Sequence, residues 1–316
     1  MASFLSAMPD DAPLSSLLIP GTHDTMAFYG WPFSQCQSIS TPLSVQFHSG
    51  IRLLDIRLTE VDGRLIAYHG AYPQKEPFQG ILVSVHEYLT SPEGARETIV
   101  MSIKPEARSD NFAQLVHNEI SISRGGWDIW FLESRIPKLG EVRGKVVMFS
   151  RFGTGEDWEG GMGIHPTYWP DSERAGFTWM CNDTTVRTND WYHIPSFLSI
   201  PEKVQLSTDL LLPVSDLGRV LNITYFSASS FPLAAPQTVA QGFGWPSWGL
   251  GVEGVNTRVG RWVLERLSED GADGEKGGPR IRGWSFIDYY EEPKNVLVPL
   301  LVEFNFRGHK EGEEGW

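Results

Sequence analysis

Two histidines and one arginine near the start of the chain have the types and spacing for phosphoryl chemistry. His23, Arg57 and His69 each stand at the end of an apolar run. Two imidazoles can divide acid and base work near pH 7, because one can start neutral and the other protonated. A guanidinium between them can bind a phosphate and neutralise the charge that develops in the transition state. The trio therefore points to phosphoryl transfer.

Short apolar runs separated by turn signals recur along the chain. Strands are predicted at 15–20, 51–58, 64–69, 98–103, 145–150, 176–181, 220–226 and 283–288. Helical periodicity is clearest at 80–90, 111–120, 256–268 and 293–304. Strands alternating with helices favour a parallel sheet, and about eight of them favour a barrel. Because no repeat or long linker divides the chain, we expect one catalytic domain over 1–307 and a mobile tail over 308–316.

Polar residues stand at the ends of most predicted strands, and in a (β/α) barrel these ends meet on the face that holds the active site. A single such residue could be an ordinary surface residue, but a set of them at six strand ends favours an active site. The set is His23, Arg57, His69, Lys104 with Glu106, Arg151 and Asp288.

Composition excludes some classes of function. The 316 residues are 41% hydrophobic and 21% charged, with a net charge of −13. A large core is therefore expected, and nucleic acid is not, because phosphate backbones need basic patches. No apolar run approaches the length of a membrane span. Residues 1–12 lack the basic start of a secretory signal, so we expect a soluble cytoplasmic protein, or a secreted one if an upstream segment was removed.

The two cysteines, Cys36 and Cys181, cannot build a disulfide framework, and their spacing matches no metal site. We interpret them as reduced or buried thiols, with a single bridge as the alternative.

Eight ordered segments resemble the bacterial-type phosphatidylinositol-specific phospholipases C, the PI-PLC X-domain family. They are Ile19-Pro20-Gly21-Thr22-His23-Asp24, Gly50-Ile51-Arg52-Leu53-Leu54-Asp55-Ile56-Arg57, Tyr68-His69-Gly70, Met101-Ser102-Ile103-Lys104, Gly144-Lys145-Val146-Val147-Met148, Arg151-Phe152, Tyr168-Trp169-Pro170-Asp171 and Ile287-Asp288-Tyr289. The resemblance implies an α/β fold: a single distorted (β/α)8 TIM-type barrel with its active site at the carboxyl ends of the strands. It implies cleavage of phosphatidylinositol to diacylglycerol and inositol 1,2-cyclic phosphate.

The resemblance also implies roles for five residues. His23 would be the general base that takes the proton of the inositol 2-hydroxyl, and Asp288 would orient its ring. His69 would be the general acid for the leaving glycerol oxygen, held by Asp24; capping a helix start is the alternative role for Asp24. Arg57 would bind the phosphate, with a structural ion pair as the alternative.

Arg57 also bears on metal dependence. Calcium-dependent relatives place a carboxylate at this position, whereas a guanidinium repels the ion, so the resemblance predicts no metal and no other cofactor. A magnesium-dependent phosphodiesterase on the same kind of barrel is the rival enzyme, and it needs a carboxylate cluster near the first histidine.

The remaining implied sites recognise substrate and membrane. Inositol would be bound by Lys104, Glu106, Arg151, Asp190 and Tyr192, and surface salt bridges are the alternative for the charged ones. Trp31, Trp245 and Trp248 would enter the membrane interface from the rim of the site, with loop anchoring as the alternative. The partners are then an inositol phospholipid and, transiently, a membrane surface, bound by a monomer.

Three alternatives stay open for the function. The substrate could be a soluble glycerophosphoinositol, which suits the negative charge, or a glycosyl-phosphatidylinositol (GPI) glycolipid. A catalytically inactive module that binds inositol lipids belongs to a different class, and the complete set of five catalytic residues argues against it.

Overall fold

The computed structural model describes residues 1–153, 162–213, 219–230, 232–269 and 281–306. Its strands are β1 (Leu18–Thr22), β2 (Leu53–Val61), β3 (Arg64–His69), β4 (Tyr72–Pro77), β5 (Thr98–Pro105), β6 (Trp130–Phe131), β7 (Lys145–Ser150), β8 (Phe177–Cys181), β9 (Thr184–Asn189), β10 (Val220–Tyr225), β11 (Gly242–Trp245), β12 (Leu250–Glu253) and β13 (Gly283–Ile287). Its α-helices are α1 (Leu43–Ser49), α2 (Phe78–Thr90), α3 (Phe112–Ser121), α4 (Leu139–Val142), α5 (Ile200–Asp209), α6 (Pro236–Gln241), α7 (Val255–Glu269) and α8 (Leu297–Glu303). The predicted tail, 308–316, lies outside the described residues.

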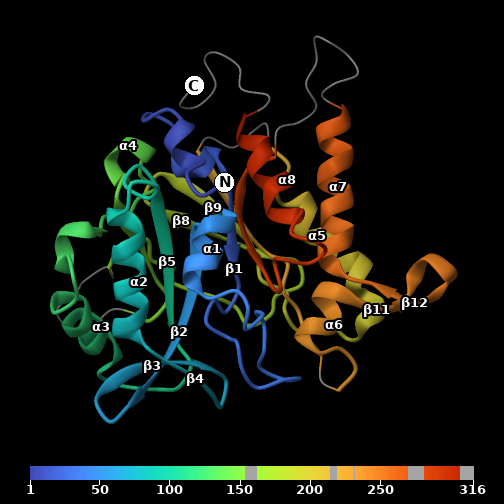
Figure 1. Cartoon of the computed structure of the whole chain (residues 1–316), viewed down its shortest axis with the longest axis horizontal. Helices are drawn as coiled ribbons and strands as arrows, with labels where there is room; N and C mark the ends of the chain where they lie inside the picture. Colours follow the sequence, from blue (N-terminus) through green and yellow to red (C-terminus); the bar gives the residue numbers. More distant parts are fainter. Residues whose placement is uncertain (154–161, 214–218, 231, 270–280, 307–316) are drawn as a thin grey trace.

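One curled sheet forms the centre of the molecule, with helices packed around it (Figure 1). Its main path runs β6-β7-β5-β2-β1-β13-β10-β9-β8, and a β3–β4 hairpin extends from β2. Neighbours on the path are parallel, except that β8 runs antiparallel to β9. Each predicted strand and helix overlaps an observed one, so the α/β prediction is confirmed.

The described residues do not form the predicted closed (β/α)8 barrel. Within them the end strands β6 and β8 do not pair with each other, so the sheet is an open, curled half-barrel. Two of the eight predicted barrel strands, β3 and β8, are instead the antiparallel arms of hairpins. Two-residue turns join these arms to β2 and β9, and a parallel crossover needs a much longer connection. Asp62 and Gly63, with φ of 50° and 73°, make the first turn.

The core is a single cluster in which both faces of the central strands are covered. All five residues of β1 and all five of β13 are buried. Gly21 permits the close approach of β1 to β2, since a Cβ there would lie 2.3 Å from the Cβ of Leu53. Among the helices, α2 turns Phe78, Ile81 and Val85 inward at the spacing expected for an amphipathic helix.

One predicted helix is shorter than expected. The sequence predicts a helix over 293–304, and α8 begins only at Leu297. Lys294 and Asn295 have φ of 55° and 56°, outside the helical region, so the chain turns before the helix can start.

A second, two-stranded sheet stands apart from the core. Strands β11 and β12 pair as a hairpin that projects beside α6 (Figure 1). Among the described helices, none has both the length and the apolar character needed to cross a bilayer.

Candidate active site

A cavity of about 650 Å³ opens where the central strands end. Its lining includes nine of the ten residues predicted for catalysis and substrate binding, and the tenth, Asp24, is buried behind it. The nine are His23, Arg57, His69, Lys104, Glu106, Arg151, Asp190, Tyr192 and Asp288. The polar residues predicted at the strand ends therefore line one cavity, although the sheet is not a closed barrel.

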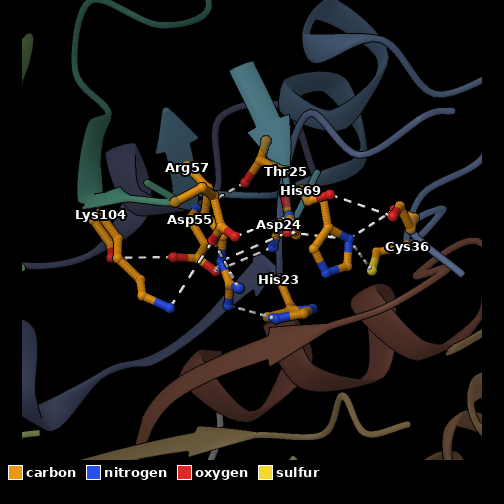
Figure 2. A network of polar contacts seen from close by, with 12 residues as sticks. His23, Asp24, Thr25, Cys36, Asp55, Arg57, His69 and Lys104 are labelled. Atoms are coloured by element: carbon orange, nitrogen blue, oxygen red, sulfur yellow. Dashed lines mark hydrogen bonds and ion pairs between the residues drawn. The ribbon is translucent and has the colours of Figure 1, made fainter. Parts of the chain in front are cut away.

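The first histidine lies between a carboxylate and a guanidinium. His23 Nδ1 lies 2.8 Å from Asp288 Oδ1. Its Nε2 lies 2.8 Å from Arg57 Nη2 (Figure 2). A guanidinium only donates, so Nε2 accepts, and the ring proton sits on Nδ1, which donates to Asp288. Burial and the charge of Arg57 hold the pKa of His23 well below its usual range. The geometry therefore presents a neutral imidazole whose basic nitrogen is Nε2.

The second histidine is fixed through its other nitrogen. His69 Nδ1 donates to the carbonyl oxygen of Ser34 at 2.7 Å and lies 3.3 Å from Asp24 Oδ2. The rings of His23 and His69 are nearly perpendicular, with centroids 6.3 Å apart. Two imidazoles therefore face one cavity at a separation that can accommodate a reacting group between them.

Asp24 does not cap a helix, because it lies in a turn between β1 and α1. Its φ is 42°, and its backbone N–H donates to Asp55 Oδ2 at 3.2 Å. Burial raises the pKa of this carboxyl to about 7, against the opposing effect of His69 and Arg57. The alternative role is thus wrong, and the carboxylate lies beside His69 as the resemblance implied.

A buried carboxylate that the sequence analysis overlooked holds Arg57. Asp55 Oδ2 accepts from Arg57 Nε at 3.0 Å, and its backbone is tied to the His23 turn through Thr25. Burial alone would raise the pKa of Asp55, but Arg57 and other donors hold it below its usual range. Asp55 precedes Arg57 by two residues on β2, so strand alternation placing both on one face was the available signal.

Arg151 is packed against aromatic rings at the cavity wall. Its guanidinium carbon lies 3.8 Å from the ring centre of Trp169, and Nη1 donates to the hydroxyl of Tyr225 at 3.2 Å. Asp190 accepts from Trp169 Nε1 at 2.9 Å and lies 3.7 Å from Arg151. Trp169 belongs to a motif quoted from the sequence, but the sequence analysis did not predict that its ring packs against Arg151. It also did not predict the contact between Tyr225 and Arg151.

The other predicted inositol ligands lie at the more open side. Glu106 accepts from Arg57 Nη1 at 3.3 Å and from the backbone of Gly70 at 2.9 Å. Lys104 Nζ lies 3.9 Å from Glu106, and Arg57 together with burial lowers the pKa of this lysine. Tyr192 donates to Asp171, another cavity residue that the sequence analysis did not single out.

The three rim tryptophans are exposed and lie outside the cavity lining. Trp31 and Trp245 are each 68% exposed, and Trp248 is 80% exposed. Trp245 and Trp248 lie on and beside the β11–β12 hairpin, next to the exposed Leu250. Trp31 also donates to Gln237 of α6 at 3.0 Å, so it is anchored as well as exposed. Membrane insertion stays a prediction for all three.

Cys36 and Cys181 are free and buried, so the predicted reduced thiols are observed and the alternative bridge is not formed. Arg52, from the same quoted segment as Arg57, is buried and donates from Nε to Glu97 Oε2 at 2.7 Å. Within the described residues, one group of side chains could hold a metal: the ligand atoms of His23, Cys36 and Asp288 lie within 4.8 Å of one another.

Sequence comparison finds bacterial relatives that match part of the chain. A Listeria monocytogenes protein named 1-phosphatidylinositol phosphodiesterase is 35% identical over 161 residues, 46% of this chain and 48% of that protein. A Staphylococcus aureus protein of the same name is 27% identical over 196 residues, 58% of each chain. The chain thus spans about half the length of the curated relatives it matches. No family model matches it.

The structural likeness covers nearly the whole chain. A mutant of phosphatidylinositol-specific phospholipase C from Staphylococcus aureus superposes with a TM-score of 0.73 at 21% identity, over 96% of this chain and 97% of that one. The Listeria monocytogenes enzyme gives 0.70 at 24% identity, over 96% and 98%. The resemblance predicted from the motifs is thereby confirmed: the chain is similar in sequence to bacterial 1-phosphatidylinositol phosphodiesterases and has the fold of bacterial phosphatidylinositol-specific phospholipase C.

Proposed function

We propose that this chain is a metal-independent phospholipase C that cleaves phosphatidylinositol to diacylglycerol and inositol 1,2-cyclic phosphate. The observation that carries the proposal is the placement of His23, Arg57 and His69 on one cavity. The names of the sequence relatives support the substrate class. The expected monomeric state and cytoplasmic location stay predictions.

His23 takes the proton of the inositol 2-hydroxyl through Nε2. The Nδ1–H donated to Asp288 keeps the ring in the tautomer that leaves Nε2 basic. As the ring becomes an imidazolium, Asp288 stabilises its charge. The activated oxygen attacks the phosphorus, and the cyclic phosphodiester forms as the bond to the glycerol oxygen breaks.

His69, in its protonated form, supplies the proton that the departing glycerol oxygen needs. Its Nδ1–H is occupied by Ser34 and faces Asp24, so Nε2–H is the group left to donate. Arg57 moves its N–H groups from Nε2 of His23 to the non-bridging oxygens, where they stabilise the growing charge. Asp55 and Glu106 keep the guanidinium between the two rings.

Inositol is bound by the charged wall of the cavity. Glu106 and Asp190 accept from ring hydroxyls, while Lys104 and Arg151 donate to them, as polyols require. Tyr192 offers an aromatic ring at the open side. The exposed tryptophans Trp31, Trp245 and Trp248 bring this cavity to the membrane surface that holds the lipid.

The decisive experiment follows the release of cyclic inositol phosphate from phosphatidylinositol in mixed micelles, with and without a chelator. We expect turnover that survives chelation. His23→Ala and His69→Ala should each lower kcat by about 10³-fold or more, because each removes one half of the proton transfer. His48→Gln is the matched control, since this exposed histidine pairs with Glu93 away from the cavity.

Loss of turnover on chelation would mean a metal enzyme. Cleavage of glycerophosphoinositol without cleavage of the lipid would move the proposal to a soluble substrate. Binding of inositol lipid vesicles without any turnover would favour the inactive binding module.

A further inference from the structure

Cys36 lies at the catalytic centre but has no part in the proposed reaction. Its side chain lines the cavity wall, and its Sγ lies 3.6 Å from Nδ1 of His69 (Figure 2). Two backbone hydrogen bonds, with Ala27 and Tyr289, fix its position. Burial and the nearby Asp288 raise the pKa of this thiol well above its usual range, so it is not a nucleophile at neutral pH.

Cys36 is surrounded by side chains that ligate metals. Its Sγ and the ligand atoms of His23 and Asp288 lie within 4.8 Å of one another. In a tetrahedral zinc site, bond lengths of about 2.0–2.3 Å place the ligand atoms about 3.3–3.6 Å apart. The backbone already holds the three ligand atoms on one wall. Side-chain rotations that move each atom by about 1 Å would therefore be enough for all three to bind one ion.

A second observation points to a cation at this wall. Asp24 Oδ2 is buried and, among the described residues, accepts no hydrogen bond. It makes only ion pairs, at 3.3 Å with His69 Nδ1 and 3.6 Å with Arg57 Nε. Asp24 Oδ2 is therefore a buried acceptor that is left available to a cation at this wall.

The ligand types select the ion. Thiolate and imidazole suit soft or borderline ions such as Zn²⁺, Cd²⁺ and Co²⁺, whereas Mg²⁺ and Ca²⁺ prefer sets made of oxygen alone. One sulfur, one nitrogen and one carboxylate with a fourth position open to the cavity resemble a zinc site and would bind the hard ions poorly.

We propose that Cys36, His23 and Asp288 form an inhibitory site for a thiophilic divalent cation, with Zn²⁺ as the physiological type. On binding, the thiol of Cys36 releases its proton to solvent, and the ion takes Nδ1 of His23 in place of the hydrogen bond to Asp288. The remaining ring proton then sits on Nε2, which displaces Arg57 Nη2 from its 2.8 Å contact with that nitrogen. His23 can then no longer accept the proton of a hydroxyl. Inhibition presupposes the proposed activity, whereas binding does not.

Binding is tested first with Co²⁺, whose visible absorption reports tetrahedral coordination and whose near-ultraviolet charge-transfer band reports a thiolate. We expect both features at one Co²⁺ per full-length chain, and their loss on addition of Zn²⁺. Cys36→Ser should abolish the charge-transfer band. Cys181→Ser is the matched control, because it removes the other buried cysteine, on β8. If Cys36→Ser does not fold, Asp288→Asn should weaken Co²⁺ binding at least tenfold.

Inhibition is tested with the micelle assay. Zn²⁺ should inhibit the parent and Cys181→Ser equally, and Cys36→Ser should need at least a tenfold higher concentration, with Mg²⁺ and Ca²⁺ without effect. The proposal is overturned if no Co²⁺ thiolate band appears in the parent, if Cys36→Ser binds Co²⁺ and responds to Zn²⁺ like the parent, or if Mg²⁺ inhibits as strongly as Zn²⁺. The Co²⁺ spectra decide the site even if the lipid is not the substrate.

Discussion

Arg57 donates a hydrogen bond to His23, with 2.8 Å between Nη2 and Nε2. The contact fixes the tautomer of the ring, because a guanidinium cannot accept a proton and so leaves the ring proton on Nδ1. It also places a positive charge beside the base, which favours the neutral ring. In the proposed reaction, one residue thus prepares the general base and lies where the phosphate charge would develop, which ties the two proposed functions to the position of a single side chain.

The pKa of His23 should respond directly to that contact. Arg57→Gln removes the positive charge beside the ring, and we expect the pKa of His23 to rise. Because burial is the larger cause, the value should still lie below that of free histidine. Nuclear magnetic resonance titration of labelled histidine measures this without any need for activity.

Lys104→Gln serves as the graded comparison for that titration. Lys104 also lowers the pKa of His23, but less than Arg57 does. A smaller upward shift is expected, and equal shifts in the two variants would contradict a direct role for the Arg57 contact.

Asp55 should matter for turnover although it does not line the cavity. Asp55→Asn keeps the shape of the side chain but removes the charge that holds Arg57 Nε at 3.0 Å. We expect kcat to fall about 10–100-fold, because the guanidinium loses its orientation relative to the two rings. Steady-state kinetics in mixed micelles measures the change.

Ser102→Ala is the control for Asp55. The Ser102 hydroxyl donates to the other carboxylate oxygen of Asp55 at 3.2 Å. Its loss leaves the bond to Arg57 in place, so kcat should change less than threefold. A large loss in this variant would mean that disruption of the core, and not orientation of Arg57, explains the Asp55 result.

The sequence predicted which residues line the cavity better than it predicted the sheet that holds them. These residues follow apolar strands within short motifs, so local patterns were sufficient to bring His23, Arg57 and His69 together on one cavity. The hairpin arms were misassigned because their direction depends on two-residue turns, although Asp62-Gly63 is a recognised hairpin signal. Strand β9 was missed because its inward residues include Thr184 and Thr188, which hydrophobicity does not mark as buried.

Residues that act through another residue were also harder to predict. Asp55 and Trp169 occur in the quoted motifs, but their roles depend on contacts with Arg57 and Arg151 that cross between strands. Cys36 lies 33 residues from His69 in the chain, so no spacing rule could have paired them.

The buried carboxyl of Asp24, which lies beside His69, should lower the stability of the folded chain at neutral pH. Its pKa is raised from 3.8 to about 7, so between these values the folded chain holds a proton that the unfolded chain has lost. The free energy of unfolding therefore falls as pH rises through this range. The loss is at most about 4 kcal/mol, at 1.36 kcal/mol per unit of pKa difference. Asp24→Asn removes the carboxyl and suits the positive φ of 42°.

We expect the free energy of unfolding of Asp24→Asn to exceed that of the parent by about 1–3 kcal/mol at pH 8, with little difference at pH 4. Urea denaturation at the two pH values measures the difference. Asp62→Asn is the matched control, because this exposed aspartate has a similar φ of 50° and should follow the parent at both values. A gain that does not depend on pH would rule out the buried carboxyl as its cause. Activity of Asp24→Asn should fall, since His69 loses its carboxylate partner.

The exposed tryptophans of the β11–β12 hairpin should set membrane binding without affecting the chemistry. Trp245→Ala and Trp248→Ala each remove an exposed indole, and we expect each to weaken partitioning onto phosphatidylinositol-containing vesicles about tenfold, or 1.4 kcal/mol. Cleavage of a short-chain, soluble phosphatidylinositol should stay within twofold of the parent, because neither side chain lines the cavity.

Ile122→Ala is the control, since Ile122 is 76% exposed beyond the end of α3 and outside the cavity. Vesicle sedimentation measures the partitioning. If Trp245→Ala and Trp248→Ala bind vesicles like the parent, the hairpin does not dock on the bilayer. If they bind normally but lose activity on the soluble substrate, the indoles instead anchor loops that shape the cavity.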